Sequence, residues 1–239
     1  MSNLQQRFLT AARQGRSKEL LICLDLDPMI STTSRNEENL SGLMLACKGG
    51  FIESVLTLLQ NDKNLNIEEV DNIGTNSLMF ACLKGKKDIV KLLLEHKSSI
   101  DKVTSNGRTA LHHGVYGGNL SVVEMLVNHG AKLDVQSDVG VSAFMFACEG
   151  GFLNISRFLL EKGATPNLFS RDLSNGFYYA CVNGHLEMMK FLVQVFKWTH
   201  SLSRAEQISL SILKWRRRSS HQKFALPGVF HAISVCLSL

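Results

Sequence analysis

Hydrophobic and small residues return along the chain at a fixed spacing of 33 residues. Three sets of positions keep this spacing: apolar residues at Leu78, Leu111, Phe144 and Phe177, leucines at Leu93, Leu126, Leu159 and Leu192, and glycines at Gly85, Gly118, Gly151 and Gly184. Two further copies lie upstream at a spacing of 35 residues, one with Ala46, Gly50 and Leu58 and one with Ala11 and Gly15. A fixed period of this length is typical of repeat proteins, so we predict six units over about residues 4–196.

Each unit predicts two helices followed by a turn. A residue whose side chain can cap a first helical turn precedes an apolar run five times, at Ser41, Asn76, Thr109, Ser142 and Asn175. The recurring glycine then ends this first helix, because glycine readily takes a left-handed conformation. The second helix is expected in segments such as KDIVKLLLEH and LNISRFLLEKG, which are too broadly apolar for a surface helix. Segments such as VTSNGRT favour a turn between units.

The unit resembles the ankyrin repeat, most plainly in NGRTALHHGVYGGNLSVVEMLVNHGAKLD and KGATPN. The resemblance spans about four fifths of the chain and implies an all-α ankyrin-repeat solenoid of helix-turn-helix units with hairpin loops. The family's T-P-L-H tetrad appears as SGLM, NSLM, TALH, SAFM and NGFY, without proline in any copy, so the caps must supply more of each helix start. The first unit lacks a preceding hairpin, and the fifth hairpin has Leu173 where glycine is usual.

The periodicity sets the expected domain boundaries. We expect a repeat domain over residues 1–197, with units near 4–35, 36–70, 71–103, 104–136, 137–169 and 170–197. Residues 198–239 form a tail without the repeat pattern, in which a capping box at Ser203 and Glu206 predicts a helix over 204–217. The tail is interpreted as a cap on the last unit, as a targeting or kinase-recognised segment around Ser219 and Ser220, or as sequence without an evolved role.

The adjacent residues His112 and His113 suggest a catalytic pair, but both occupy repeat positions. In the ankyrin pattern the first would hydrogen-bond within and between repeats, and the second stands where other copies have Leu45 and Phe80. The register sets no nucleophile or orienting acid beside them. No paired C-x-x-C or H-E-x-x-H spacing predicts a metal site. We therefore expect no catalytic residues, cofactor or metal, and no enzyme.

The distribution of charge and the positions of the cysteines limit the expected binding partners and the expected cellular compartment. Residues 1–196 carry 19 Lys and Arg against 20 Asp and Glu, whereas 197–239 carry seven against one. Nucleic acid is therefore not expected to bind the repeats, and binding of nucleic acid or an anionic membrane surface through the basic tail is the alternative. No apolar stretch is long enough to predict a transmembrane segment. Four cysteines share one repeat position as small core residues, which favours a reducing cytoplasm or nucleus: Cys47, Cys82, Cys148 and Cys181.

The resemblance implies a module that binds another protein, as an adaptor or scaffold, through hairpin tips and the concave helix face. The partner's identity and the oligomeric state stay open at this point. By register, the expected contact positions are Glu37, Glu38, Lys48, Asn72, Ile73, Leu83, Lys84, Ser105, Asn106, Arg108, Tyr116, Asp138, Val139, Glu149, Arg171, Asp172 and Val182. Leu83, Tyr116 and Val182 are the strongest candidates, because they would form an exposed apolar line interrupted by Glu149.

Overall fold

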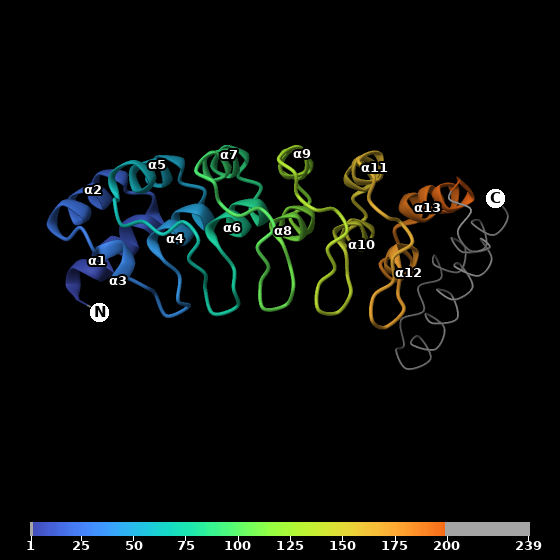
Figure 1. The fold of residues 1–239 in the computed structure, drawn as a ribbon, viewed down its shortest axis with the longest axis horizontal. Helices are drawn as coiled ribbons and strands as arrows, with labels where there is room; N and C mark the ends of the chain where they lie inside the picture. The colour runs from blue at the N-terminus through green and yellow to red at the C-terminus, as the bar shows by residue number, and fades with distance from the viewer. Residues whose placement is uncertain (1, 199–239) are drawn as a thin grey trace. The chain divides into compact units, whose positions relative to one another are not determined.

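A computed structural model describes residues 2–198 of the chain (Figure 1). The predicted tail helix over 204–217 and Ser219 and Ser220 lie outside the described residues. The chain divides into two compact units, Met1–Lys132 and Leu133–Leu239, called the N-terminal and C-terminal units below. The described residues form thirteen α-helices: α1 (Asn3–Gln14), α2 (Ser17–Leu26), α3 (Ile30–Thr33), α4 (Gly42–Gly49), α5 (Ile52–Asn61), α6 (Ser77–Leu83), α7 (Lys87–Glu95), α8 (Ala110–Tyr116), α9 (Leu120–Asn128), α10 (Ala143–Glu149), α11 (Leu153–Glu161), α12 (Gly176–Val182) and α13 (Leu186–Trp198).

The helices pair and stack as the periodicity predicts. In the N-terminal unit, α1, α4, α6 and α8 pack in one row, and α2, α5, α7 and α9 pack in a second row, which lies above the first in Figure 1. In the C-terminal unit, α10 packs on α11 and α12, and α12 packs on α13. The first helices of the pairs are called the inner row and the second helices the outer row, and hairpin loops extend from the starts of the inner-row helices. The all-α repeat architecture is confirmed.

All five predicted caps are present. In each case the capping side chain accepts a hydrogen bond from the backbone N–H three residues later, for Ser41, Asn76, Thr109, Ser142 and Asn175. The Asn76 and Asn175 bonds are both 3.0 Å long. The first N–H groups of a helix have no carbonyl partner within it, and each capping side chain supplies one. These residues can therefore start helices that lack the proline of the ankyrin pattern.

The recurring glycines end the first helices as expected. Gly50, Gly85, Gly118, Gly151 and Gly184 all have positive φ, between 65° and 78°. After α4, the N–H of Phe51 donates to the carbonyl of Ala46 over 3.0 Å, which closes the helix end. This turn lets the second helix run back along the first.

The repeated apolar positions form the core. Leu126, Phe144 and Phe177 are at most 1% exposed. Cys47, Cys82, Cys148 and Cys181 are buried free thiols. Burial raises the pKa of the Cys47, Cys82 and Cys148 thiols well above its usual value, so these side chains pack as neutral, small apolar groups.

A ladder of carboxylates, which the sequence analysis missed, joins successive repeats. Glu68 accepts the N–H of Ser99 over 2.8 Å, and Asp101 accepts the N–H of Lys132 over 3.1 Å. In the C-terminal unit, Asp134 accepts the N–H of Thr165 over 2.9 Å. Glu68, Asp101 and Asp134 are themselves 33 residues apart, so one repeat position supplies the bond each time.

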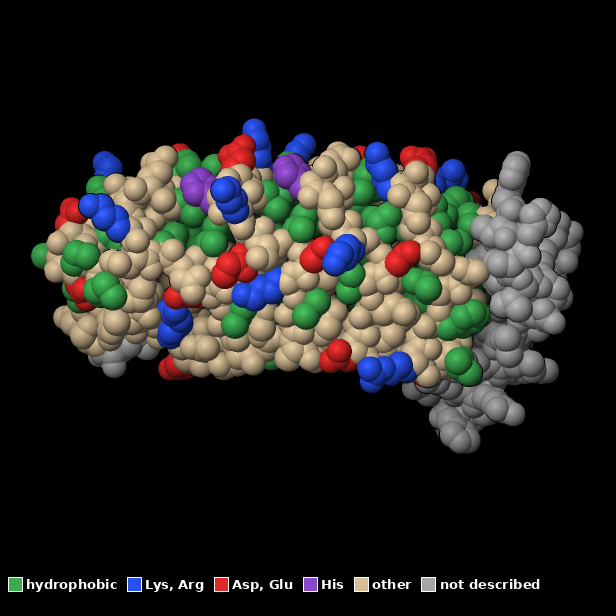
Figure 2. All heavy atoms as spheres, in the orientation of Figure 1, with side chains coloured by type: hydrophobic (Ala, Val, Ile, Leu, Met, Phe, Trp, Pro, Cys, Tyr) green, Lys and Arg blue, Asp and Glu red, His purple; other side chains and the backbone are tan. Residues whose placement is uncertain are grey.

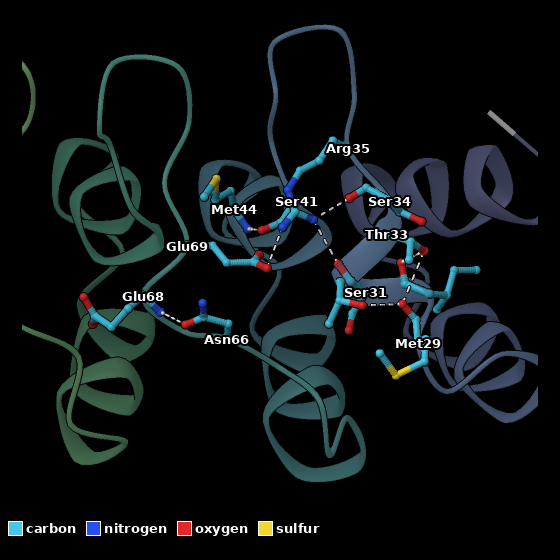
Figure 3. A network of polar contacts seen from close by, with 12 residues as sticks. Met29, Ser31, Thr33, Ser34, Arg35, Ser41, Met44, Asn66, Glu68 and Glu69 are labelled. Carbon is cyan, nitrogen blue, oxygen red and sulfur yellow. Dashed lines mark hydrogen bonds and ion pairs between the residues drawn. The ribbon is translucent and has the colours of Figure 1, made fainter.

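A second polar network fixes the segment before α4 (Figure 3). Arg35 donates to the backbone carbonyls of Ser31 and Ser34 over 3.0 and 2.7 Å. The same guanidinium forms an ion pair with Glu69, which is mostly buried. Arg35 therefore ties the first hairpin to the second within the N-terminal unit.

Leu173 adopts the backbone conformation of the glycine that it replaces. Its φ is 61°, and the equivalent hairpin residues Asn39, Gly74, Gly107 and Gly140 also have positive φ. A leucine pays about 1–2 kcal/mol in this left-handed region, because its Cβ crowds the backbone. The side chain is 73% exposed, so it gains little packing in return. The fold thus holds Leu173 in an unfavourable conformation.

Replacing Leu173 by glycine is expected to raise the free energy of unfolding by about 0.5–1 kcal/mol. Relief of the left-handed strain exceeds the extra chain entropy that glycine brings to the unfolded state. Urea unfolding of Leu173→Gly measures the gain. Leu173→Ala is the matched control, because it removes the side chain but keeps the strain. An equal gain in both variants would contradict this explanation.

Candidate protein-binding surface

The exposed residues of the inner-row helices form the first part of the candidate surface. In the N-terminal unit Tyr116 ends α8 and is 62% exposed, while Lys48 and Lys84 at the ends of α4 and α6 are also exposed. In the C-terminal unit Val182 ends α12 and is exposed. Large exposed apolar side chains favour protein contacts when polar groups surround them. Tyr116 and Val182 therefore have the exposure expected of anchors.

Leu83 and Glu149 differ from the predicted exposed line. Both side chains are half-buried. The backbones of α6 and α8 lie close together here, since a Cβ added to Gly117 would lie only 2.4 Å from the Leu83 carbonyl oxygen. Leu83 and Tyr116 belong to the N-terminal unit, and Glu149 and Val182 to the C-terminal unit. The continuous line across these four positions stays a prediction.

The hairpin residues form the second part. Those exposed are Glu37, Glu38, Asn72, Ile73, Ser105, Asn106, Asp138, Val139, Arg171 and Asp172, whereas Arg108 is half-buried. Several also hold the hairpins together. The N–H of Ser105 donates to the Ile73 carbonyl over 2.8 Å, and the N–H of Arg171 donates to the Val139 carbonyl over 2.9 Å. Adjacent hairpins within each unit are thus linked, which presents their tips in a fixed order.

Asp172 has a structural role inside its own hairpin. One carboxylate oxygen accepts hydrogen bonds from the Ser170 hydroxyl and the Ser174 N–H, and the other accepts from the Ser174 hydroxyl. A side chain that satisfies its own loop is less available to a partner. We therefore rank the neighbouring exposed residues Val139 and Arg171 above it.

The described residues also border two hollows, one beside the first hairpin and one between outer-row helices. In the N-terminal unit a hollow of about 340 Å³ lies between α1 and the first hairpin, bordered by Arg13, Glu37 and Glu38. In the C-terminal unit a hollow of about 730 Å³ lies between α11 and α13, bordered by Leu160, Phe191 and other residues. The first includes two predicted contact residues, and the second includes none.

Some exposed apolar residues were missed by the sequence analysis. They are Leu21, Ile22, Leu26, Met29 and Ile52 around α2 and α5, Val103 before the third hairpin and Leu173 in the last. For Leu21 a partial signal was present, since the equivalent position holds Leu56 in the next repeat but Lys91, Glu124 and Arg157 in the three after it. An apolar residue at a position that other copies make charged indicates exposure.

His112 serves the start of α8. The N–H of Thr109 donates to Nδ1 of His112 over 3.1 Å, while the Thr109 hydroxyl caps the N–H of His112. This reciprocal pair is a capping box, with histidine in the place of the usual acidic or amide residue. Because Nδ1 accepts, the ring of the buried His112 carries its proton on Nε2.

His113 has a different environment. It is half-buried, and its Nε2 is buried without a hydrogen-bond partner among the described residues. Burial is the main cause that lowers the pKa of His113 to about 4; the nearby charge of Arg108 acts in the same direction, and the charge of Asp71 opposes both. The imidazole is therefore neutral near pH 7 and packs where other copies place Phe80 and Phe146.

The free energy of unfolding is expected to fall as the pH is lowered from about 6.5 towards 4. In this window the unfolded chain takes up a proton at His113 and the folded chain does not, so acid favours unfolding. Each pKa unit corresponds to about 1.4 kcal/mol, which partial exposure reduces, so we expect a loss of about 1–2 kcal/mol. Urea unfolding at several pH values measures it.

The variant His113→Phe isolates this contribution. Phenylalanine stands at the equivalent position in two other repeats, so the fold accepts it. All other titrating groups remain in the variant. The difference between the wild-type and variant profiles of unfolding free energy against pH is therefore due to His113. Parallel profiles, or an NMR titration of His113 with a pKa near 6.5, would contradict the prediction.

Comparison with known proteins agrees with the repeat architecture. A family model for ankyrin repeats (3 copies) matches residues 8–104, 43–137, 96–170 and 133–200. A rice (Oryza sativa subsp. japonica) protein named probable E3 ubiquitin-protein ligase XBOS33 is 28% identical to this chain over 97 residues. That stretch is 41% of this chain and only 18% of the rice protein.

Proposed function

Because this chain belongs to the ankyrin-repeat family, whose repeats generally mediate protein–protein interaction, we propose that it is an adaptor or scaffold. It binds another protein through its hairpin tips and the exposed face of its inner-row helices. The observation that carries the proposal is the exposure of Tyr116 on a rigid helix end, beside other residues that vary between repeats while the core positions agree. Aromatic anchors of this kind dominate the energy of protein interfaces.

We propose that the chain acts by binding and not by catalysis. The described histidines support this: His112 caps a helix, and His113 is a neutral packing residue. Within residues 2–198 no helix is long and apolar enough to cross a membrane. The similarity to the rice protein covers too little of that protein to transfer its activity. Formation of ubiquitin conjugates by the purified chain with activating and conjugating enzymes would overturn the non-catalytic proposal.

We place this binding in the cytoplasm or nucleus. The support is the set of five described cysteines, which are all buried free thiols, as is common in reducing compartments. Binding of nucleic acid or an anionic membrane surface through the basic tail is the alternative for the remaining residues. A steep loss of nucleic-acid binding with salt that depends on Arg216, Arg217 and Arg218 would favour it.

The double variant Leu83→Ala with Tyr116→Ala is expected to weaken partner capture at least tenfold, about 1.4 kcal/mol. Both residues lie on the inner row, and their loss removes apolar contact area with little effect on folding. Partners are identified by affinity purification and mass spectrometry, and the affinity of the main partner is then measured by calorimetry.

A double variant on the outer row provides the matched control. Leu21→Ala with Leu26→Ala removes the same kind of exposed apolar area from α2 in the same unit. We expect it to capture partners as the wild type does. Loss of capture in this control alone would place the binding surface on the outer row and contradict the proposal.

A further inference from the structure

Lys84 and Lys86 are two of several lysines on the N-terminal unit whose charges no described carboxylate neutralises. Lys84 follows α6 and Lys86 precedes α7, and both are exposed. Among the described residues, no Asp or Glu oxygen lies within ion-pair distance of either ammonium group. Their positive charge is therefore available to a partner.

The stem of Lys86 lies against the preceding repeat. A Cβ added to Gly50 would be 2.3 Å from Cε and 2.8 Å from Nζ of Lys86, so the end of this side chain lies against Gly50 and would have to move if a larger residue stood there. This packing orients the ammonium group at the turn between α4 and α5. A long side chain that is already ordered loses less entropy on binding.

A third lysine, Lys48, extends the positive surface to the repeat before. Its Nζ lies 5.7 Å from the centre of the Phe80 ring and 3.1 Å from Glu38 Oε2. Both charged side chains of this pair are exposed, so the pair contributes little and is easily exchanged for another carboxylate. Asp71 is a carboxylate of the next hairpin, but it does not pair with these lysines. Its Oδ1 accepts hydrogen bonds from the backbone N–H groups of Ile73 and Thr75.

An apolar patch lies beside Lys84. Leu83 directly precedes Lys84, and its carbonyl oxygen lies against Gly117, the residue that follows Tyr116. The half-buried Leu83 and the exposed Tyr116 therefore belong to one surface of α6 and α8. Over the inner-row helices of this unit, Lys and Arg side chains lie interspersed with hydrophobic and acidic ones (Figure 2).

We propose that this surface binds an extended acidic segment of the partner protein, with carboxylates on Lys84 and Lys86 and an apolar side chain against Tyr116. The inference rests on the proposed function and names the chemistry of the partner. Neighbouring helices lie about 8–10 Å apart, and an extended chain covers about 3.3–3.6 Å per residue. Acidic and apolar residues about three positions apart therefore meet successive repeats.

Three fluorescein-labelled synthetic peptides test the inference by fluorescence anisotropy with the full chain. The first, GEELEELEELEG, is acidic with a leucine at every third position. The second, GEESEESEESEG, replaces the leucines by serine, and the third, GKKLKKLKKLKG, replaces the glutamates by lysine. We expect the first to bind with the highest affinity, the second at least threefold more weakly, and the third not to bind. Equal binding of all three would overturn the inference.

Two charge-reversal variants locate the site. K84E with K86E reverses two charges on the proposed binding surface. R216E with R217E makes the same change of charge in the tail. We expect the first to weaken binding of GEELEELEELEG at least tenfold and the second to leave it unchanged, with both proteins keeping the wild-type melting temperature. The reverse result, in which only the tail variant loses binding, would overturn the inference.

The outcome also separates this inference from the proposed function. If Leu83→Ala with Tyr116→Ala weakens partner capture while the acidic peptide fails to bind, the surface around Leu83 and Tyr116 binds a partner segment that is not acidic. In that case the acidic-segment inference alone is wrong. If that double variant and its outer-row control capture partners equally well, the proposed function is wrong as well.

Discussion

Replacing Leu126 by alanine is expected to lower the free energy of unfolding by about 2–5 kcal/mol. Leu126 lies in α9 and is fully buried. Its truncation removes apolar contacts and leaves a cavity, because α7 and α8, which pack on α9, cannot close the space. Loss of this size makes Leu126→Ala one of the two most damaging substitutions considered for this chain.

Chemical unfolding in urea, followed by circular dichroism, measures the effect. Leu26→Ala is the matched control, since Leu26 ends α2 in the same unit and is 65% exposed. The same atoms are removed there, but most of them already contact solvent, so we expect a change below about 0.5 kcal/mol. Equal destabilisation by the two variants would show that the repeat register does not mark the core.

Replacing Gly140 by alanine is expected to cost about 2–5 kcal/mol, although it adds only one methyl group. Gly140 has a φ of 80°, which costs an alanine about 1–2 kcal/mol. The added Cβ would also lie 2.6 Å from the backbone nitrogen of Arg171 and 2.8 Å from the Cα of Ser170. Backbone cannot move aside as a side chain can, so the two hairpins must separate and the Arg171–Val139 hydrogen bond is strained.

Gly163→Ala separates the two costs. Gly163 also has a positive φ, of 96°, but a Cβ added there meets nothing within 4 Å. We therefore expect only the backbone strain of about 1–2 kcal/mol in this variant. Unfolding of both variants in urea provides the comparison. If Gly140→Ala were no more destabilising than Gly163→Ala, close packing of the hairpins would not limit this position.

The cap and glycine positions were predictable because both act locally. A Ser, Thr or Asn before an apolar run satisfies an N–H three residues away, and the five predicted caps all do so. The recurring glycines were predictable for the same reason, since the left-handed turn is a property of one residue. Repetition strengthened each prediction, because one position was tested in several copies.

The candidate surface was predictable in position but not in detail. Register alone placed Tyr116, Val182 and most hairpin residues on the surface, and the structure shows them exposed. It did not predict that Leu83 is half-buried, that Asp172 satisfies its own loop, or that Leu173 is exposed in a strained conformation. These properties depend on the neighbouring repeat or on the path of the loop. Partner binding at these residues stays a prediction.

The sequence by itself determined the repeat register, the starts and ends of the first helices, and the apolar positions that form the core, because each is a local or periodic property of the chain. Only the tertiary structure decided how the pairs are joined. Glu68, Asp101 and Asp134 each accept an N–H from about 31 residues away, and Lys86 packs on Gly50 of the preceding repeat. The carboxylate position repeats in the sequence, but no local pattern names its partner. Contacts between repeats exist only after the helices stack.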